Sequence, residues 1–524
     1  MTHSVQTLLQ WLRDDGFSPE VSGPAADGTG AVAAIDPDTV ITRLCIDSRA
    51  VTRGSLFAAL PGHQVDGHSF IARALEAGAA CVLAQRPPQD DERAALSGCW
   101  ITLEDSPRAL ARLAARFYGP LPERLIGVTG TNGKTSVAHF TRLLLDPARC
   151  ASIGTLGLRP EGLFALPGLT SPDALSLAQA LGAAAAAAAG MDHAVLEASS
   201  HGLEQGRLAG LDFTAAGFTH LSRDHLDYHE TMDAYWQAKR SLFTRHLTPG
   251  ARVVIDERLP QAQELAALGL DLFRLGALGS ETADLAYAAR PRSGGLTLQL
   301  AWKGEQAKDF DLPLFGKFQA ENIAVAMGLA RVGGADAAPE ALDARLAGLA
   351  QAGTTLGVPG RMMPVTHHPE APHGRVLVDY AHTPDALATA LQAARPHCEG
   401  RLMVVFGAGG DRDPGKRVLM GEAAAHFADW SLITDDNPRS EDPAAIRAAV
   451  RRGAPEALEV GDRAEAIAAA LAAMAPEDLL LIAGKGHETG QVVGATTLPF
   501  DDAEQTQRAA ATLWGQSPNG GTGS

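Results

Sequence analysis

The feature that most constrains the fold is a glycine-rich segment between an apolar run and a helical pattern. RLIGV at 124–128 leads into TGTNGKTS at 129–136, and VAHFTRLLL at 137–145 then places apolar residues at helical spacing. A phosphate-binding loop requires this order of strand, glycine-rich turn and helix, because its backbone amides must face phosphate oxygens where the helix begins. The segment therefore predicts a layered α/β domain that binds a nucleotide.

Apolar runs of strand length alternate with longer Ala- and Leu-rich helical patterns along much of the chain. Such alternation is typical of α/β proteins whose largely parallel sheets are covered by helices. The further strand-length runs are HAVLEA at 193–198, RVVID at 252–256, RVLVDY at 375–380, LMVVFGAGG at 402–410, WSLITDD at 430–436 and DLLLIAGKG at 478–486. We therefore expect an α/β fold with parallel-rich sheets.

The length of 524 residues exceeds what one ordinary core supports, so we expect about three domains. Proline and glycine punctuate the chain in YGPLPERL at 118–125 and in LGVPGRM at 356–362. These segments divide the chain near 119 and 358. The predicted domains span 1–118, 119–357 and 358–524.

Charge and cysteine content narrow the function classes. The chain carries 61 acidic and 44 basic residues, a net charge of -17, which disfavours nucleic acid or an anionic membrane as a partner. The 5 cysteines form no CxxC pair and are odd in number, which indicates reduced thiols in a cytosol and no structural zinc. The first residues, MTHSVQTLLQWLRDDGF, lack the basic and apolar regions of a signal peptide. We expect a cytoplasmic protein without membrane insertion, whose anionic substrates bind at local arginines, lysines and helix N-termini.

Within the glycine-rich loop, each residue type suits a triphosphate with magnesium. Lys134 can reach the β- and γ-phosphates and the Thr135 hydroxyl can hold the metal ion. The stricter GxxxxGK[ST] spacing fails because Val128 occupies the first glycine position, which leaves a GTNGKT variant and weakens a generic NTPase assignment. The residues expected to contact the nucleotide are Gly130, Thr131, Asn132, Gly133, Lys134, Thr135 and Ser136.

Two further segments carry candidate metal ligands. In VLEASSHGLEQGRL at 195–208, the strand pattern ends at Glu197, where α/β sheets place ligands and where a carboxylate can bind magnesium. THLSRDHLDYHE at 219–230 precedes a helical stretch that contains Lys239. This second segment taken alone could form a hydrolase metal site, although each histidine alone is as readily a hydrogen-bonding or surface residue. Its candidate ligands are His220, Asp224, His225, Asp227 and His229.

Several motifs together resemble the Mur ligases of peptidoglycan synthesis, and the resemblance spans most of the chain. DSRAVTRGSLFAALPGHQVDGHSFI at 47–71 is similar to a UDP-sugar-binding domain of that family, and DDNPRSEDP at 435–443 and GKGHE at 484–488 favour the member that adds diaminopimelate. The shared motifs are, in order, GTNGKT at 130–135, EASSHGL at 197–203, HLSRDHLDYH at 220–229, DYAHTPDAL at 379–387 and GGDRDPGKR at 409–417.

The resemblance implies three domains: an N-terminal one for the UDP-sugar, a central P-loop ATPase and a C-terminal Rossmann-like domain for the incoming amino acid. It also implies an ATP- and Mg²⁺-dependent ligase that joins meso-2,6-diaminopimelate to UDP-N-acetylmuramoyl-L-alanyl-D-glutamate, as a monomer, in cytoplasmic cell-wall synthesis. A carboxylate is a poor electrophile, so ATP first converts it to an acyl phosphate, which the amine then attacks.

Site residues follow by matching motifs. The resemblance implies Lys134, Glu197, His225 and Lys239 as catalytic, with Thr135, Glu197, His225 and a carbamylated Lys239 as metal ligands. It adds Asn322, Arg361 and Asp379 to the nucleotide-binding set, with His382 nearby. The implied nucleotide-sugar contacts are Ile46, Ser48, His63, Gln64, Val65, Thr170, Ser171, Ser199, Gln205 and Arg207. The implied diaminopimelate contacts are Arg412, Asp436, Asn437, Pro438, Arg439, Gly484 and Glu488.

Two of these residues have a simpler interpretation from spacing alone. From spacing alone, Lys239 is expected to be a surface lysine on a helix. A carbamate on this side chain would instead supply an anionic oxygen to magnesium. Arg439 then reads as an exposed residue of a DDNPR turn. Its guanidinium can also pair in a bidentate fork with the distal carboxylate that distinguishes diaminopimelate from lysine.

The sequence departs from the family pattern at Gln319, Met363 and Ser171, where GxFNxxN, VPGRMEPV and TTPD have Asn, Glu and Thr. None of these positions removes a proposed catalytic group. The alternatives are a folylpolyglutamate synthetase, a lysine-adding ligase, a nucleotide-binding regulator and a metal hydrolase. A dinucleotide site at GAGGDRDPGKR is disfavoured because the third glycine of GxGxxG is absent.

Overall fold

A computed structural model describes residues 2–24, 34–62, 65–166, 169–187, 190–334, 337–351, 356–368, 370 and 374–515. The chain forms two compact units. One comprises Met1–Phe273 with Leu329–Asp336, and the other comprises Arg274–Gly328 with Ala337–Ser524. Strand β14 (Asp271–Ala277) and helix α11 (Phe318–Gly333) each run from one unit into the other.

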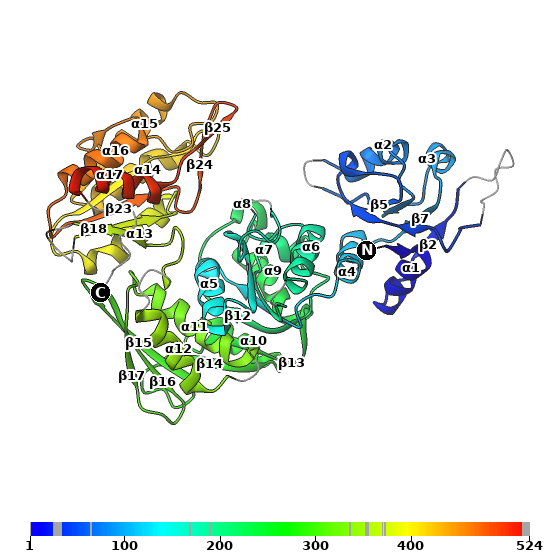
Figure 1. Ribbon diagram of the computed structural model, residues 1–524, viewed down its shortest axis with the longest axis horizontal. Coiled ribbons are helices and arrows are strands. Elements are labelled where there is room, and N and C mark those ends of the chain that lie inside the picture. The colour runs from blue at the N-terminus through cyan, green and yellow to red at the C-terminus, as the bar shows by residue number, and fades with distance from the viewer. Residues whose placement is uncertain are drawn as a thin grey trace. The chain divides into compact units, whose positions relative to one another are not determined.

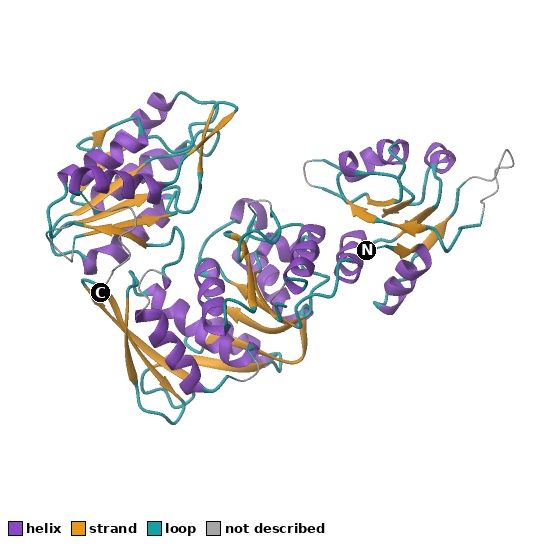
Figure 2. Ribbon diagram, viewed as in Figure 1, coloured by secondary structure: helices purple, strands orange, loops and turns teal. Residues whose placement is uncertain are grey.

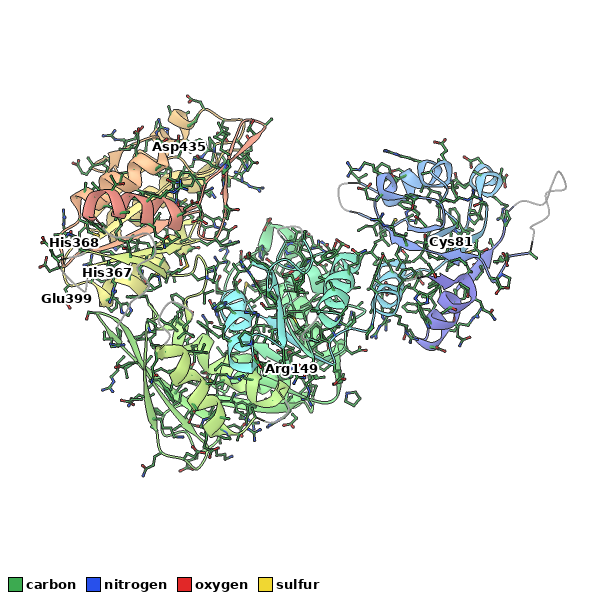
Figure 3. All side chains as sticks on the ribbon, in the orientation of Figure 1. Cys81, Arg149, His367, His368, Glu399 and Asp435 are labelled. Carbon is green, nitrogen blue, oxygen red and sulfur yellow. The ribbon has the colours of Figure 1, made fainter. Side chains whose placement is uncertain are left out.

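The first unit begins with a five-stranded sheet in the order β2-β7-β6-β5-β4, parallel except for the edge strand β2. Helices α1 and α4 pack on one face and α2 on the other, as the two clusters of buried side chains indicate (Figure 1). Cys81, labelled in Figure 3, is buried in β6. The strands are β2 (Glu20–Ser22), β4 (Arg43–Cys45), β5 (Ser55–Ala58), β6 (Cys81–Ala84) and β7 (Cys99–Thr102), with β1 (His3–Ser4) paired to β3 (Val40–Ile41). The helices are α1 (Val5–Asp14), α2 (Ile71–Glu76), α3 (Asp90–Ala95) and α4 (Ser106–Phe117).

The central sheet contains the predicted strand-and-loop segment. Its strands in this unit follow the order β10-β9-β11-β8-β12-β13-β14, and β9, β11, β8, β12 and β13 run parallel. The strands are β8 (Arg124–Thr129), β9 (Cys150–Gly154), β10 (Gly157–Arg159), β11 (His193–Glu197), β12 (Phe213–Phe218) and β13 (Leu247–Asp256). The helices are α5 (Lys134–Leu145), α6 (Ala174–Ala185), α7 (Ser200–Glu204), α8 (Leu226–His229), α9 (Met232–Arg245) and α10 (Pro260–Ala267).

The second unit begins with an antiparallel meander that pairs with the end of β14. Its strands are β15 (Leu285–Arg292), β16 (Gly295–Trp302) and β17 (Lys308–Leu312), followed by α11 and α12 (Pro339–Gln351). In β16 the buried residues Leu296, Leu298 and Leu300 alternate with less buried ones, so one face of the meander packs inward.

A six-stranded sheet in the order β18-β19-β23-β20-β21-β22 forms the rest of this unit. It is parallel except for the edge strand β18, and buried clusters on both faces show helices on either side (Figure 2). The strands are β18 (Met363–His367), β19 (Arg375–Asp379), β20 (Leu402–Phe406), β21 (Trp430–Ile433), β22 (Leu458–Glu459) and β23 (Leu479–Ala483), with a hairpin of β24 (Gly490–Val493) and β25 (Thr496–Pro499). The helices are α13 (Pro384–Ala394), α14 (Gly415–Phe427), α15 (Pro443–Arg451), α16 (Arg463–Ala473) and α17 (Asp502–Trp514).

The structure confirms the predicted α/β fold with parallel-rich sheets, and every predicted strand run contains a strand. Several strands end earlier than the apolar run, because the final residues turn into a loop: β20 ends at Phe406 and β21 at Ile433. These early ends matter for the site, since the loops carry its polar residues. Among the described residues, no helix combines the length and apolar character needed to cross a membrane.

Candidate active site

The glycine-rich loop lies between the central strand β8 and helix α5. Gly133 caps α5 with φ 87°, and Gly130 has φ 144°. A Cβ at Gly130 would lie 1.8 Å from Thr219 Oγ1, so no larger residue fits there. Val128 is fully buried in β8, between its neighbours β11 and β12. The turn therefore starts at Gly130. Val128, which stands where the stricter motif has its first glycine, packs within the sheet instead.

Two side chains, one at the start of α5 and one just after β12, hydrogen-bond to the loop and fix its conformation. Lys134 Nζ donates to the carbonyls of Gly130 at 3.0 Å and Thr131 at 2.7 Å. Thr219 Oγ1, just after β12, donates to the carbonyl of Asn132 at 2.6 Å. The first amides of α5 and the lysine thus lie together at a helix N-terminus, an arrangement suited to phosphate groups.

A hydroxyl and a carboxylate meet beside the loop. Thr135 Oγ1 donates to Glu197 Oε2 at 2.9 Å, and Glu197 is 3% exposed at the end of β11. Thr155 supports the same carboxylate, because its amide donates to Oε1 at 2.8 Å. A Cβ at Gly154 would lie 2.0 Å from Glu197, so this glycine leaves room for the carboxylate. Hydroxyl and carboxylate oxygens are ligands that Mg²⁺ prefers, so this pair fits that ion.

Lys239 is buried next to the loop, so its interpretation as a surface lysine is wrong. The residue is only 1% exposed, and its Nζ donates to the carbonyl of Gly130 at 2.7 Å. Nζ also lies 4.3 Å from the ring centroid of Tyr235. Burial, with a smaller contribution from Lys134, lowers the pKa of Lys239 to about 6. The side chain is therefore largely a neutral amine at pH 7.

The burial of Lys239 has a signal in the sequence of α9. The buried residues of this helix form a stripe at helical spacing, and Lys239 lies in its middle. The stripe consists of Tyr235, Trp236, Lys239, Leu242 and Phe243. A lysine on the apolar face of an amphipathic helix is the pattern that could have predicted its burial.

The histidine-rich segment at 219–230 lies beside the ring of Tyr235. His225 adopts a left-handed conformation with φ 53°, and its side chain is 47% exposed. Its ring centroid lies 6.1 Å from that of Tyr235 and 4.9 Å from that of His201. Burial, together with Lys134 and Lys239, lowers the pKa of His220, which places that ring near both lysines. Among the described residues, no group of three or more His, Cys, Asp or Glu side chains is placed so that it could hold a metal ion.

The predicted nucleotide-sugar contacts of the central domain form one hydrogen-bonded group around Ser171. Its hydroxyl donates to the carbonyl of Glu197 at 2.8 Å and accepts from the amide of Ser199 at 3.0 Å. Arg207 donates to the carbonyl of Ser171 at 2.7 Å and to Gln205 Oε1 at 2.5 Å. Thr170 joins the group through Thr155, with 3.1 Å between their hydroxyl oxygens. The serine that replaces the family's threonine therefore keeps the hydroxyl at the centre.

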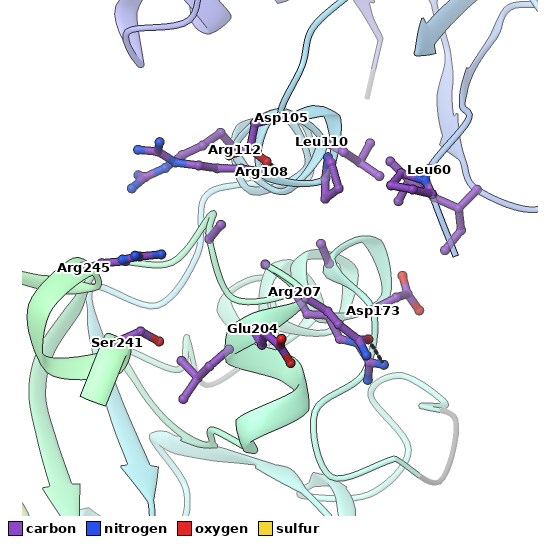
Figure 4. A pocket seen from close by; sticks show the side chains of 18 of the residues that line it. Leu60, Asp105, Arg108, Leu110, Arg112, Asp173, Glu204, Arg207, Ser241 and Arg245 are labelled. Carbon is purple, nitrogen blue, oxygen red and sulfur yellow. Dashed lines mark hydrogen bonds between the residues drawn. The ribbon is translucent and has the colours of Figure 1, made fainter. Parts of the chain in front are cut away.

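A cavity of about 950 Å³ opens beside this group (Figure 4). Gln205 and Arg207 line it, together with Ile46, which directly follows β4. The other charged residues on its wall are the arginines Arg108, Arg112 and Arg245 and the acidic residues Asp105, Asp173 and Glu204. Four arginines therefore lie on the wall of one cavity in a chain of net charge -17, a composition compatible with an anionic substrate.

The remaining predicted contacts of the N-terminal domain are more dispersed. Ser48 is buried at the start of a short 3₁₀ turn, whereas Val65 is 58% exposed. His63 and Gln64 lie outside the described residues.

In the second unit, the predicted nucleotide residues belong to one local network. Asn322 donates to Gln319 Oε1 at 3.0 Å, and Gln319 donates to the carbonyl of Arg361 at 3.4 Å. The longer glutamine therefore still connects α11 with the segment before β18. Asp379, at the end of β19, accepts from the amides of Met362 and Ala381, each at 2.8 Å. Burial raises the pKa of the Asp379 carboxyl, against the opposing effect of Arg361.

The predicted diaminopimelate residues lie on loops at the carboxyl ends of β20, β21 and β23, the edge where α/β sheets bind ligands. Asp436 and Asn437 are buried, and Asn437 donates to Glu488 Oε2 at 3.0 Å. Gly484 has φ 122°, and its amide donates to the carbonyl of Asp379 at 3.1 Å. Pro438 is buried, while Arg412 is exposed.

Arg439 is held in a strained loop conformation. Its φ is 53°, and its amide donates to the carbonyl of Val492 in the β24–β25 hairpin at 3.0 Å. Its Nη1 donates to the carbonyl of Gly410 at 2.7 Å. The DDNPR segment is therefore a turn, as predicted, but its arginine packs toward the β20 loop instead of standing exposed. Asp435, labelled in Figure 3, opens this turn and accepts from Arg447 at 2.5 Å.

Sequence reasoning missed three residues that contact the predicted set. Thr155 binds the carboxylate of Glu197, and Tyr235 packs on Lys239. Lys485 is fully buried and donates to Asn437 Oδ1 at 3.1 Å. Thr155 follows β9, a strand that was not predicted, so only Lys485 had an available signal: it lies within the GKGHE motif at the end of a predicted strand run.

The fold and the site define a P-loop enzyme whose α/β domains bind a nucleotide triphosphate together with Mg²⁺. Family models match three ranges: Mur ligase family, catalytic domain at 40–118; Mur ligase middle domain at 128–330; and Mur ligase, glutamate ligase domain at 360–486. The chain belongs to the Mur ligase family.

Curated relatives and solved structures agree with this assignment. The chain is 44% identical over 489 residues to the UDP-N-acetylmuramoyl-L-alanyl-D-glutamate--2,6-diaminopimelate ligase of Caulobacter vibrioides, covering 90% of this chain and 96% of that relative. It is also 44% identical over 500 residues to the ligase of the same name from Bradyrhizobium diazoefficiens, covering 93% and 99%. A solved structure of a ligase of this name matches with TM-score 0.65 at 32% identity, over 98% of this chain and 99% of that one. A folylpolyglutamate synthase of Mycobacterium tuberculosis, at 22% identity, shares the fold over 79% of this chain with TM-score 0.53.

Proposed function

We propose that this protein is an ATP-dependent ligase that joins 2,6-diaminopimelate to UDP-N-acetylmuramoyl-L-alanyl-D-glutamate, a step of peptidoglycan precursor synthesis. The observation that carries the proposal is the 44% identity to ligases of this name along 90% of the chain. The folylpolyglutamate alternative is disfavoured, because a Mur ligase family model also matches residues 40–118 and the named ligase covers 90% of the chain, against 79% for the folylpolyglutamate synthase.

The chemistry requires a carboxylate to become an electrophile at neutral pH. ATP transfers its γ-phosphoryl group to the carboxylate, the free amine attacks the acyl phosphate, and phosphate leaves the tetrahedral intermediate. Lys134 and the first amides of α5 orient the phosphates, since this transfer depends mainly on positioning and charge neutralisation. Thr135, Glu197 and His225 would hold Mg²⁺, which supplies charge neutralisation at the phosphates when bound.

Lys239 is suited to carry a carbamate. Carbamate formation consumes a neutral amine and CO₂ and releases one proton, and a lysine with a pKa of about 6 is neutral at pH 7. The product is an anion whose oxygens can bind Mg²⁺, whereas the ammonium form would repel the ion. The buried position beside Gly130 supports this role.

The incoming amino acid is proposed to bind at the carboxyl end of the second unit's six-stranded sheet. Arg439 pairs with the distal carboxylate of diaminopimelate, and the acidic residues Asp436 and Glu488 pair with an ammonium group. We further propose domain boundaries at 1–118, 119–357 and 358–524, a cytoplasmic location and a monomeric enzyme. The boundaries follow the Pro- and Gly-rich segments at 118–125 and 356–362.

The test is a phosphate-release assay with product identification by mass spectrometry. Phosphate release is expected only when ATP, the UDP-linked dipeptide and diaminopimelate are all present. With equal diaminopimelate and lysine, the product should contain diaminopimelate, and Arg439→Ala should lower that preference by roughly tenfold or more. Release without the dipeptide or without the amino acid would contradict ligation, and an unchanged preference in Arg439→Ala would contradict the assigned pocket.

A further inference from the structure

A buried lysine lies among the proposed amino-acid contacts, and the mechanism above gives it no role. Lys485 directly follows Gly484 after β23, and its side chain is fully buried. Its Nζ donates to Asn437 Oδ1 at 3.1 Å and to Glu488 Oε2 at 3.3 Å. Nζ also lies 3.9 Å from Asp436 Oδ1. A buried ammonium is costly unless it is paired and hydrogen-bonded, so these groups together account for its charge.

The side chain of Asn437 is hydrogen-bonded to other groups of the protein. Its Oδ1 accepts from Lys485 and from the amide of Val492 at 2.9 Å, and its Nδ2 donates to Glu488 Oε2. The bonds from Asn437 and from Lys485 therefore end on the same oxygen of Glu488, Oε2. Together with the hydroxyl of Tyr380, a further hydrogen-bond partner of Glu488, these two donors fix the orientation of the carboxylate. Glu488 is 35% exposed at its side chain, so it can meet a ligand.

Lys485 also separates two like charges. Asp436 and Glu488 both lie within 3.9 Å of its Nζ. Two carboxylates that share a small site without a cation repel each other, so loss of the ammonium group would favour conformations in which the two side chains lie further apart.

Two other cations near these carboxylates, Arg463 and Lys416, have hydrogen-bond partners of their own. Arg463, on α16, is bound by Asp502 through two bonds of 2.7 Å. Lys416, on α14, donates to the carbonyl of His382 at 3.0 Å. Arg412 and Arg439 lie on the neighbouring loops, where Arg439 donates to a backbone carbonyl, and Tyr380 adds a hydroxyl beside Glu488. Lys485 is therefore the cation that directly hydrogen-bonds the proposed ammonium-binding group.

Resting on the proposed function, we infer that Lys485 is a positioning residue for the amino-acid substrate. It holds Glu488 and Asp436 as a fixed anionic pair that binds an ammonium group of the incoming diamino acid. Lys485 itself makes no contact with ATP or with the nucleotide-sugar in this role. Replacing Lys485 should therefore weaken the binding of diaminopimelate and leave the binding of ATP and of the nucleotide-sugar unchanged.

The first experiment measures steady-state kinetics of Lys485→Met, in which the side chain keeps its approximate length and loses its charge. We expect the KM for diaminopimelate to rise roughly ten- to hundredfold, the range for losing hydrogen bonds to a charged group. The KM values for ATP and for the UDP-linked dipeptide should change less than about twofold, and kcat at saturating diaminopimelate should be largely retained. Lys485→Gln, which keeps a donor without charge, gives a second test should the methionine variant fold poorly.

Arg401→Met is the matched control in the same sheet. Arg401 bonds the buried Asp478 at 2.6 Å just before β20, at the opposite end of the strands from the amino-acid loops. This change should lower the melting temperature without altering the KM for diaminopimelate. An equal rise of that KM in Arg401→Met would mean that loss of stability alone explains the effect, and would overturn the inference.

A double-mutant cycle with Glu488→Gln tests whether Lys485 acts through Glu488. We expect Lys485→Met to raise the KM less than about threefold in the Glu488→Gln background. Full additivity, or a KM within twofold of wild type in Lys485→Met, would overturn the inference while wild-type ligation leaves the proposed function intact. A wild-type protein that does not ligate diaminopimelate would instead overturn the proposed function itself.

Discussion

Lys239 is buried on the apolar face of α9, beside the phosphate-binding loop. A lysine that is 1% exposed and bonded to a loop carbonyl contributes a neutral amine beside the phosphate-binding turn. The structure joins Thr135 to Glu197 through a hydrogen bond. The sequence predicted each as a magnesium ligand, Thr135 from the phosphate loop and Glu197 from the carboxyl end of a strand. It could not predict how far Lys239 is buried, since that depends on the packing of α9 against the sheet.

Replacement of Lys239 by alanine should abolish ligation, by roughly 10²-fold or more, because the anionic oxygen ligand is lost. Short carboxylic acids such as acetate should restore part of the activity by occupying the vacated volume. Phosphate release and product formation measure both effects. Lys303→Ala, at an exposed lysine, is the control and should remain active. Undiminished activity in Lys239→Ala would contradict the carbamate.

The lowered pKa of Lys239 also predicts how stability depends on pH. The amine has a pKa of about 6 in the folded protein and an ordinary value of 10.5 when unfolded, so between these values the unfolded chain binds more protons. Stability from this group therefore rises with pH from about 6 towards 10.5, and its penalty is fully present below about 6. Lys239→Met should stabilise the CO₂-free protein more at pH 6 than at pH 9, as denaturant titrations can measure. A difference between variant and wild type that is equal at both pH values would contradict the shift.

At the scale of elements, the C-terminal helix α17 is tied to the sheet by a fully buried ion pair. Arg463 at the start of α16 meets Asp502 at the start of α17, and Arg463 Nη2 also donates to the carbonyl of Ala483 at 3.0 Å. Ala483 directly precedes the GKGHE loop, so the buried Arg463–Asp502 pair stabilises the base of the loop that carries the proposed amino-acid site. The strand runs predicted this sheet correctly, but the pairing of residues at 463 and 502 has no local signal, because it joins two helices far apart in the chain.

Asp502→Asn should destabilise the protein by about 3 to 5 kcal/mol, because it leaves a buried guanidinium without its partner. Urea unfolding followed by circular dichroism measures the change. The control on the same helix is Glu504→Gln, whose ion pair with Arg508 is exposed, and it should cost less than about 1 kcal/mol. Equal effects of the two substitutions would show that the burial of the Arg463–Asp502 pair carries no special stability.

At the scale of the whole molecule, the proposed contacts divide between two compact units. The glycine-rich loop, Glu197 and Lys239 lie in the first unit, and the amino-acid residues around Asp436 and Glu488 lie in the second. Alternating strand and helix patterns predicted the α/β layers of both. The meander of β15 to β17 was not predicted, because its strands β16 and β17 alternate apolar with polar residues, as β16 does at Leu296, Leu298 and Leu300, and so lack the continuous apolar runs of buried parallel strands.

Two compact units should respond separately to their own ligands. A ligand at 100 times its Kd stabilises the structure that binds it by about 2.7 kcal/mol. Hydrogen exchange read by mass spectrometry should therefore show that the UDP-linked dipeptide slows exchange mainly in the peptides that contain its proposed contacts, at 46–65, 170–171 and 199–207. Diaminopimelate alone should slow exchange mainly in peptides of 402–493. The two shared elements, β14 and α11, should show intermediate protection with either ligand, because each belongs to both units. Equal protection of both ranges by diaminopimelate alone would mean that the units behave as one cooperative body, and protection confined to the first unit would contradict the placement of the amino-acid site.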